Sequence, residues 1–195
     1  MDIVLATRNR KKIEEIKRIL CLPLRIFTLD NFPECPKVEE TGDTFEANAV
    51  KKATTVSRCT GMPAIADDSG LEVYALNRAP GVLSARYAGE GADDRENIER
   101  LLYEMRSFDD KRGARFVCCI ALALPDSSTN IFYGYVEGRV GREPRGFNGF
   151  GYDPVFYPEG HNRTFAEMSD DEKDAISHRA MALRELHRYL LGKTR

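Results

Sequence analysis

The sequence of 195 residues lacks long apolar runs, Cys/His clusters and an excess of charge of one sign. No stretch approaches the ~18 consecutive apolar residues of a membrane span, and residues 1–6 lack the cationic lead-in of a secretory signal. We therefore expect no membrane association. The five cysteines form no CxxC pair, so we expect no disulfide framework or zinc site, small buried thiols, and a reduced, cytoplasmic location. The net charge of −2 argues against nucleic acid as a partner.

The length suits one domain over residues 1–195, or one domain with two lobes. Predicted helices begin near residues 10, 45, 94 and 170, the second and fourth with capping boxes at Asp43–Glu46 and Ser169–Glu172. Ser177 could instead cap a separate helix. The predicted strands cover residues 3–6, 25–29, 64–66, 115–124 and 131–136. This interleaving predicts an α/β layered fold, and the turn-linked strands near 115–142 predict some antiparallel pairing.

A basic segment lies between the first predicted strand and helix. Helix N-termini bind anions because their first N–H groups are unpaired, so a triphosphate is the ligand class that this segment favours. It is no Walker A loop, because GxxxxGK[ST] is absent. The plain alternative is a solvated basic helix start. The candidate residues are Thr7, Arg8, Asn9, Arg10, Lys11 and Lys12.

Adjacent carboxylates, Asp67 and Asp68, end an apolar strand and precede Ser69. Mg²⁺ prefers carboxylate oxygens together with substrate phosphates. Since neighbouring side chains of a strand face opposite sides, we expect only one of the two to point into a cleft. Glu40 could complete a metal site with Asp68, although its segment alone reads as a surface loop. An Asp-rich turn is the alternative for the pair.

Two further segments suit recognition of a base. In the glycine-rich stretch 147–154, an aromatic ring could stack on a base and Asp153 could accept a base N–H. The alternative is a tight turn with its aromatic side chains folded into the core. The second segment is Ser177-His178-Arg179, with Lys173 shortly before it. His178 lies roughly opposite the apolar stripe of its predicted helix, which favours exposure over core packing. A solvated charged face is its alternative.

Taken in order, these segments resemble the inosine triphosphate pyrophosphatase family along the whole chain. Six motifs carry the resemblance: Thr7-x-Asn9-x-x-Lys12-x-x-Glu15, Glu39-Glu40-Thr41-Gly42, residues 64–71 (AIADDSGL), residues 79–87 (APGVLSARY), residues 149–154 (GFGYDP), and Glu172-Lys173-x-Ala175-Ile176-Ser177-His178-Arg179. Arg8 and Asn148 stand where many relatives carry Gly.

The resemblance implies an α/β fold with an elongated central mixed β-sheet flanked by helices, two lobes with the active-site cleft between them, and a homodimer. It implies hydrolysis of the non-standard purine nucleotides ITP, dITP and XTP to the nucleoside monophosphate and pyrophosphate, with Mg²⁺. Thr7 to Lys12 would hold the triphosphate, and Lys12 would stabilise the leaving pyrophosphate. Glu40 and Asp68 would bind Mg²⁺, with Asp68 as general base. The other substrate contacts would be Ser69 and, around the base, Phe150, Gly151, Tyr152, Asp153, Lys173, His178 and Arg179.

Other functions stay open at this stage. A related pyrophosphatase could prefer pyrimidine triphosphates, as the septum-inhibitor-like group does. A non-catalytic nucleotide sensor would need no general base, and a nucleic-acid-binding protein would use the cations of residues 8–12. The residues do not indicate how guanine is rejected, or whether Asp68 acts directly or through a water bound to the metal.

Overall fold

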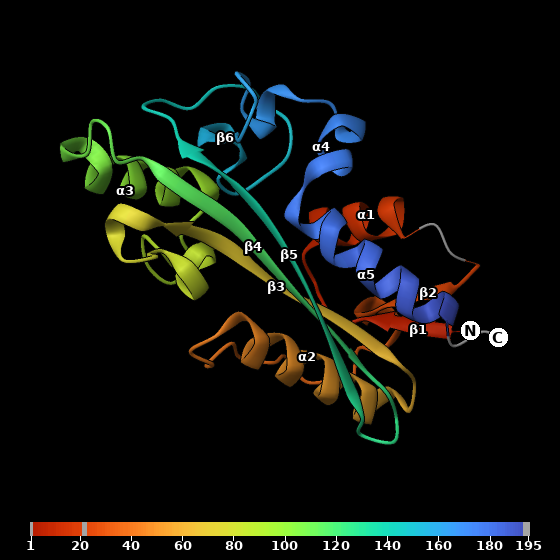
Figure 1. Cartoon of the computed structure of the whole chain (residues 1–195). Coiled ribbons are helices and arrows are strands. Elements are labelled where there is room, and N and C mark those ends of the chain that lie inside the picture. The colour runs from red at the N-terminus through yellow and green to blue at the C-terminus, as the bar shows by residue number, and fades with distance from the viewer. Residues whose placement is uncertain (1, 21–22, 193–195) are drawn as a thin grey trace. The chain divides into compact units, whose positions relative to one another are not determined.

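The computed structural model describes residues 2–20 and 23–192 (Figure 1). Six strands form one mixed sheet in the order β2-β1-β3-β4-β5-β6. Strand β1 (Asp2–Leu5) pairs in parallel with β2 (Arg25–Thr28) and β3 (Ala64–Val73), whereas β5 (Thr129–Val140) and β6 (Phe156–Pro158) are antiparallel. Strand β4 covers Gly113–Ala123. The predicted α/β class and mixed sheet are confirmed.

The chain divides into two compact units. Unit 1 contains residues 1–68, 118–134 and 179–195, and unit 2 contains residues 69–117 and 135–178. Strands β3, β4 and β5 each contribute residues to both units. The single domain with an active-site cleft between two lobes stays a prediction.

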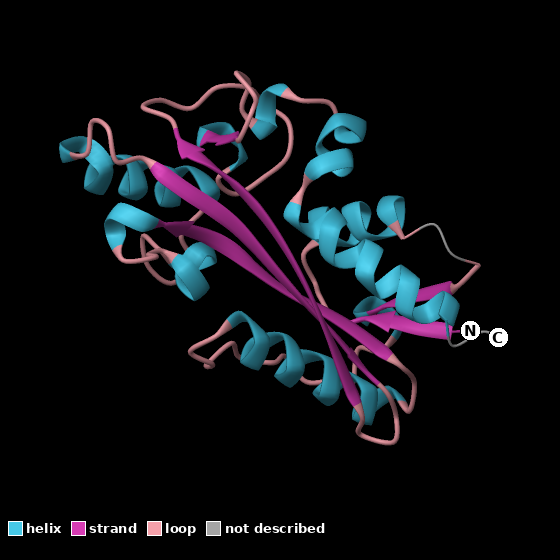
Figure 2. Ribbon diagram, in the orientation of Figure 1, coloured by secondary structure: helices cyan, strands magenta, loops and turns pink. Residues whose placement is uncertain are grey.

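Unit 1 is layered. Helices α1 (Arg10–Ile19) and α5 (His178–Gly192) lie on one face of its strands, and α2 (Phe45–Thr60) lies on the other (Figure 2). Apolar side chains of α1 and α5 pack on the strands because their buried positions recur at helical spacing. This core comprises Ile3, Leu5, Ile16, Leu20, Ile65, Cys118, Ile120, Leu122, Ala182, Leu183, Leu186 and Leu190.

Unit 2 has its own core, built around the remaining halves of the long strands. Helix α3 (Asp94–Glu104), helix α4 (Asp170–Ile176) and β6 surround it. Three phenylalanines at its centre make aromatic contacts, with ring centroids 4.6 to 6.0 Å apart. Its members include Leu71, Val73, Ile98, Leu101, Met105, Phe116, Tyr152, Phe156 and Phe165.

The helix starts follow the predictions with one correction. Ser169 caps α4 through the predicted box with Glu172, and Ser177 is extended between α4 and α5, so the alternative of a separate last helix is right. The box predicted at Asp43 is wrong by one residue: Thr44 is the N-cap of α2 and accepts from the N–H of Ala47. Asp43 therefore precedes the cap.

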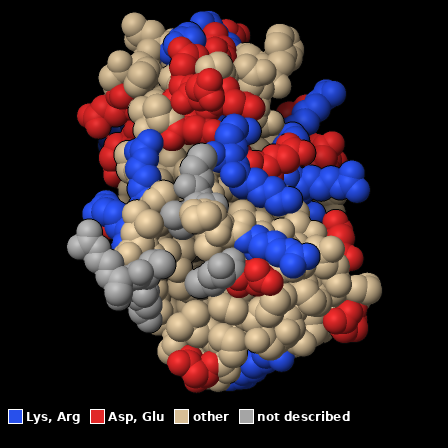
Figure 3. All heavy atoms as spheres, turned by 90° about the vertical axis from the view of Figure 1, so that its right-hand side faces the viewer, with Lys and Arg blue, Asp and Glu red and all other residues tan. Residues whose placement is uncertain are grey.

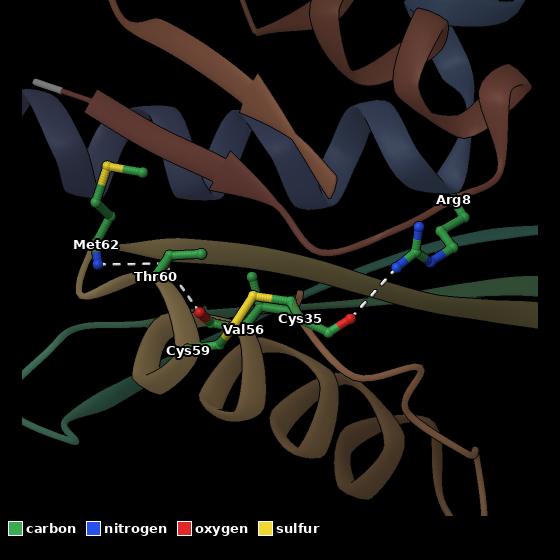
Figure 4. The surroundings of a disulfide bond; sticks show 6 residues. All are labelled: Arg8, Cys35, Val56, Cys59, Thr60 and Met62. Carbon is green, nitrogen blue, oxygen red and sulfur yellow. Dashed lines mark hydrogen bonds between the residues drawn. A yellow bond between two sulfur atoms is a disulfide. The ribbon is translucent and has the colours of Figure 1, made fainter. Parts of the chain in front are cut away.

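The prediction of no disulfide is wrong. Cys35 and Cys59 are joined, with their Cα atoms 5.8 Å apart, and Figure 4 shows the bond linking the loop before α2 to the last turn of that helix. The spacing of 24 residues carries no signal, because pairing depends on where the tertiary structure returns the chain. Arg8 donates to the Cys35 carbonyl at 3.4 Å. Cys118 and Cys119 are buried free thiols, as expected.

The surface mixes charges of both signs. On the face drawn in Figure 3, basic and acidic side chains lie next to one another rather than in separate fields, in keeping with the net charge of −2. Within residues 2–20 and 23–192, no helix has the length and apolar content needed to cross a membrane.

Candidate active site

The predicted phosphate-binding segment follows β1 and leads into α1. The parallel register of β1 and β3 pairs Leu5 with Ile65, so the chain leaves β1 next to the part of β3 that carries Asp67 and Asp68. Asn9 is the N-cap of α1, and its side chain accepts from the N–H of Lys12 at 3.2 Å. The N–H of Asn9 donates to the Thr7 hydroxyl at 3.2 Å. These bonds orient the first turn of α1, as an anion site requires.

Asp67 and Asp68 continue strand β3 rather than ending it, and their partners come from opposite faces of the sheet. Asp67 pairs with Lys12 of α1 at 2.6 Å and Arg179 of α5 at 3.0 Å, and Arg179 also pairs with Glu15. Asp68 meets side chains of α2 on the other face. The expectation that the two carboxylates face opposite sides is therefore confirmed.

The Asp67 group is a buried ion network. Asp67 and Arg179 are 1% exposed and Glu15 is 5% exposed. Burial alone would raise the pKa of Asp67, but the cations of Lys12 and Arg179 hold that pKa well below its ordinary value. Asp67 is therefore ionised at neutral pH and pairs with Lys12 in the first turn of α1. On this face of the sheet, Asp67 orients the Lys12 ammonium, and Lys12 and Arg179 supply positive charge.

The Asp68 group has the composition expected of a reactive site. The Lys52 ammonium lies 2.5 Å from a Glu40 oxygen and 3.5 Å from Asp68 Oδ1, and it also donates to the Asp67 carbonyl at 2.7 Å. Burial raises the pKa of Asp68, and Lys52 opposes that rise. Burial would lower the pKa of Lys52, but Asp68 and Glu40 raise it. Two carboxylates therefore converge on one cation, as they would on a metal ion.

Two residues of this group were missed in the sequence. Asn48 and Lys52 lie one turn apart on α2 and are buried at 0% and 9% exposure. Their spacing of four places both on one helix face, next to the apolar stripe of Ala49 and Ala53. Polar residues bordering a buried stripe were the available signal, but only the fold shows that they face Asp68.

In unit 2, the glycine-rich loop is organised around a buried ion pair. Lys173 donates to Asp153 Oδ2 at 2.6 Å, and the N–H of Phe150 donates to the same oxygen at 2.9 Å. Asp153 and Lys173 are 2% and 3% exposed. The Lys173 ammonium also lies 5.0 Å from the centroid of the Phe150 ring, a cation–π distance. The structure thus brings together three residues predicted around the base.

A glycine is required at the centre of this loop. Gly149 has φ +72°, and a Cβ there would lie 2.1 Å from Asp153 Oδ2. The loop is held further by the N–H of Gly151, which donates to Asp94 at 2.8 Å, and by the hydroxyl of Tyr152, which donates to the Ser84 carbonyl at 2.8 Å. The alternative of a tight turn with core-packed aromatics is therefore right for the backbone and for Tyr152, which is 4% exposed, while Phe150 is half-buried.

The Ser177-His178-Arg179 segment is divided between the units. His178 belongs to unit 2, where its ring stacks on Phe116 at 4.6 Å, and it is 4% exposed. The expectation of an exposed histidine, drawn from one continuous helix, is wrong because Ser177 breaks that helix. Arg179 belongs to unit 1, and Ser69, half-buried on β3, to unit 2. The substrate contacts predicted for these residues stay predictions.

The remaining predicted phosphate contacts lie at the surface. Arg8, Arg10 and Lys11 are exposed, in contrast to Lys12, whose side chain is 15% exposed. Thr7 is half-buried. Lys12 is held beside Asp67 by their 2.6 Å ion pair.

Taken together, the mixed α/β sheet and the acidic group at the edge of its parallel strands define an α/β protein with a candidate anion- and cation-binding site. The model of the Ham1 family matches residues 3–189, and the chain belongs to this family. A dITP/XTP pyrophosphatase of Streptomyces avermitilis is 49% identical over 188 residues, covering 94% of each chain. One of Coxiella burnetii is 48% identical over 190 residues, covering 95% of this chain and 94% of the other.

Solved structures are similar throughout. A HAM1 protein from Coxiella burnetii superposes with a TM-score of 0.90 at 46% identity, covering 98% of this chain and 99% of the other. The Ham1 protein of Staphylococcus aureus gives a TM-score of 0.90 at 42% identity, covering 99% and 100%. The chain therefore shares both sequence and fold with Ham1 proteins over nearly its whole length.

Proposed function

We propose that this chain hydrolyses dITP, ITP and XTP between the α- and β-phosphates, giving the nucleoside monophosphate and pyrophosphate. The names of its relatives support the substrate class. The observation that carries the proposal is the convergence of Asp68, Glu40 and Lys52 on one face of β3, while the neighbouring Asp67 holds Lys12 of α1 on the other. It combines a carboxylate of raised pKa with cations and helix N–H groups suited to phosphate.

Mg²⁺ is the proposed cofactor. Glu40 and Asp68 supply hard oxygen donors, and both carboxylates already lie within 3.5 Å of a single cation, the Lys52 ammonium. This donor set fits Mg²⁺, which binds through one or two carboxylates plus substrate phosphates. When bound, Mg²⁺ would offset phosphate charge and orient the phosphates.

The proposed reaction divides between the two faces of β3. Asp68 takes a proton from the attacking water, whose oxygen bonds to the α-phosphorus while the bond from that phosphorus to the bridging oxygen breaks. Lys12, held by Asp67, and the first N–H groups of α1 stabilise the charge on the leaving pyrophosphate. Lys52 keeps Glu40 and Asp68 together despite their like charges.

The proposed base recognition uses the loop of unit 2. Phe150 would stack on the purine, and Lys173 would donate to the C6 carbonyl that hypoxanthine and xanthine carry. Adenine presents an amino group at that position, so it would leave the Lys173 donor unpaired, and such mismatches can reduce kcat/KM by a factor of about 10⁴. Asp153 orients Lys173 through the 2.6 Å bond.

The resemblance also supports a homodimer. The cytoplasmic location stays a proposal, but the Cys35–Cys59 bond removes the argument from unpaired thiols on which it was based. Light scattering coupled to gel filtration tests the homodimer, since a chain of 22.0 kDa should elute near twice that mass.

The test of the function is pyrophosphate release with Mg²⁺ from dITP, ITP, XTP, dGTP, dATP and UTP, with Asp68→Asn alongside. We expect rapid release from the first three, with similar kcat/KM for dITP and ITP, and loss of activity in the variant by a factor of about 10² to 10⁴. Release of single orthophosphate would refute the cleavage site, and preference for UTP would refute the base assignment. No release from any nucleotide would favour a sensor.

A further inference from the structure

Asn48 joins two parts of the Asp68 group that the sequence places far apart. It lies in the first turns of α2 and is fully buried. Its Nδ2 donates to Asp68 Oδ2 at 3.1 Å, and its Oδ1 accepts from the N–H of Gly42 at 2.8 Å. One amide therefore links strand β3 to the loop that carries Glu40.

The Asp68 carboxylate is held from two sides. Oδ2 accepts from Asn48 at 3.1 Å, while Oδ1 lies 3.5 Å from the Lys52 ammonium. A carboxylate with a bond to each oxygen has a fixed plane and cannot rotate freely about its last side-chain bond. This fixed plane leaves the remaining lone pairs of Asp68 in a set direction.

The loop before α2 is held just as closely. A Cβ at Gly42 would lie 2.9 Å from Asn48 Oδ1 and 2.8 Å from the Cβ of Ala47, so only glycine allows this approach. The Nδ2 of Asn48 also donates weakly to the Gly42 carbonyl at 3.4 Å. Since Gly42 is two residues after Glu40, the position of the Glu40 backbone depends on this contact.

We propose that Asn48 is a positioning residue of the hydrolytic reaction: through a single amide it sets the orientation of Asp68 and the distance of the Glu40 loop from it. The inference rests on the proposed function. An amide suits this task because it donates at one atom and accepts at the other. An ionised aspartate of the same shape could still accept from Gly42 but could not donate to Asp68, and it would add a like charge.

The test compares Asn48→Asp and Asn48→Ala with a matched control, Ser57→Ala. Ser57 lies on the same helix, is 1% exposed, and donates to the Met62 carbonyl at 2.8 Å away from the acidic group. Steady-state kinetics with dITP and Mg²⁺ give kcat and KM. A hydrogen bond to a charged group corresponds to a factor of about 10 to 100, and we expect kcat to fall by that factor in both Asn48 variants, with KM within about threefold and Ser57→Ala unchanged.

Asn48→Asp separates positioning from a purely structural role. If it keeps the kcat of the unsubstituted protein, the bond to Asp68 is dispensable and the proposal is overturned. A rise in KM at constant kcat would also overturn it, because orientation of the general base acts on the chemical step. If Asn48→Ala fails to fold, the kcat of the isosteric Asn48→Asp variant tests whether the bond from Asn48 to Asp68 is needed.

A binding measurement separates this inference from the proposed function. Paramagnetic Mn²⁺ is titrated into the protein without nucleotide, and we expect Asn48→Ala to weaken its binding about five- to tenfold relative to Ser57→Ala, because Glu40 and Asp68 lose their common placement. If the unsubstituted protein hydrolyses no nucleotide, the proposed function fails and this titration alone decides on Asn48. Equal Mn²⁺ affinity in the two variants would overturn the inference.

Discussion

Replacing Arg179 with methionine should strongly destabilise unit 1. The guanidinium is 1% exposed and serves two buried carboxylates, Asp67 at 3.0 Å and Glu15. Methionine has a similar apolar length but cannot pair with them. Removing one partner from a buried ion group costs about 3–5 kcal/mol, since the charges left behind stay desolvated. Asp67 keeps Lys12 at 2.6 Å, so the variant should fold under mild conditions.

Urea denaturation followed by circular dichroism measures the loss. For a chain of this size, about 3–5 kcal/mol lowers the melting temperature by roughly 6–20 °C. Arg188→Met is the control. Arg188 lies on the same helix, pairs with Glu185, and has a side chain that is 70% exposed, so the urea concentration at the midpoint of unfolding should hardly change. A double-mutant cycle with Glu15→Gln should then give a coupling of more than about 1 kcal/mol.

The reasoning would be refuted by either of two results. The first is a loss of less than about 1 kcal/mol in the free energy of unfolding for Arg179→Met, which would mean that Asp67 and Glu15 are solvated or pair with other cations. The second is an equal loss for Arg188→Met, which would remove burial as the cause. A KM increase for dITP in Arg179→Lys, without loss of stability, would instead support the predicted contact with substrate.

Three further predictions concern the disulfide, the glycine-rich loop and pH. The double substitution Cys35→Ser with Cys59→Ser should lower stability by about 3–4 kcal/mol in the chain-entropy treatment of a bridge spanning 24 residues. Denatured, unreduced protein should titrate at most three of the five thiols in the sequence, and a titre of five would disprove the bridge. Gly149→Ala should raise the KM for dITP at least about tenfold by displacing Asp153, and an unchanged KM would contradict that loop's role. The folded-state pKa of Asp67 lies below its ordinary value of 3.8, so the stability that its ionised form contributes is complete above about pH 5 and is lost as pH falls below about 4. The free energy of unfolding, measured from about pH 6 to about 2.5, should therefore depend less on pH in Asp67→Asn than in the unsubstituted protein. The same pH dependence in both proteins would contradict this role of Asp67.

The sequence by itself determined much of this protein. Apolar spacing and capping residues placed most helices and strands, because local propensity and burial pattern agree there. The Asp67–Asp68 pair, Glu40 and Lys12 were singled out as candidates from their chemistry, their order along the chain and the resemblance to a family. The opposite orientation of the two aspartates followed from the period of two in a strand alone.

The tertiary structure decided which charges meet. Asn48 and Lys52 are ordinary polar residues of an amphipathic helix until α2 packs beside Asp68, and Arg179 is an ordinary surface candidate until it is buried between Glu15 and Asp67. The Cys35–Cys59 bond likewise depends on where the chain returns. Local sequence fixes conformation through short-range sterics and hydrogen bonds. Partners 20 to 164 residues apart are chosen only when the core packs and desolvation forces each buried charge to find its counterpart.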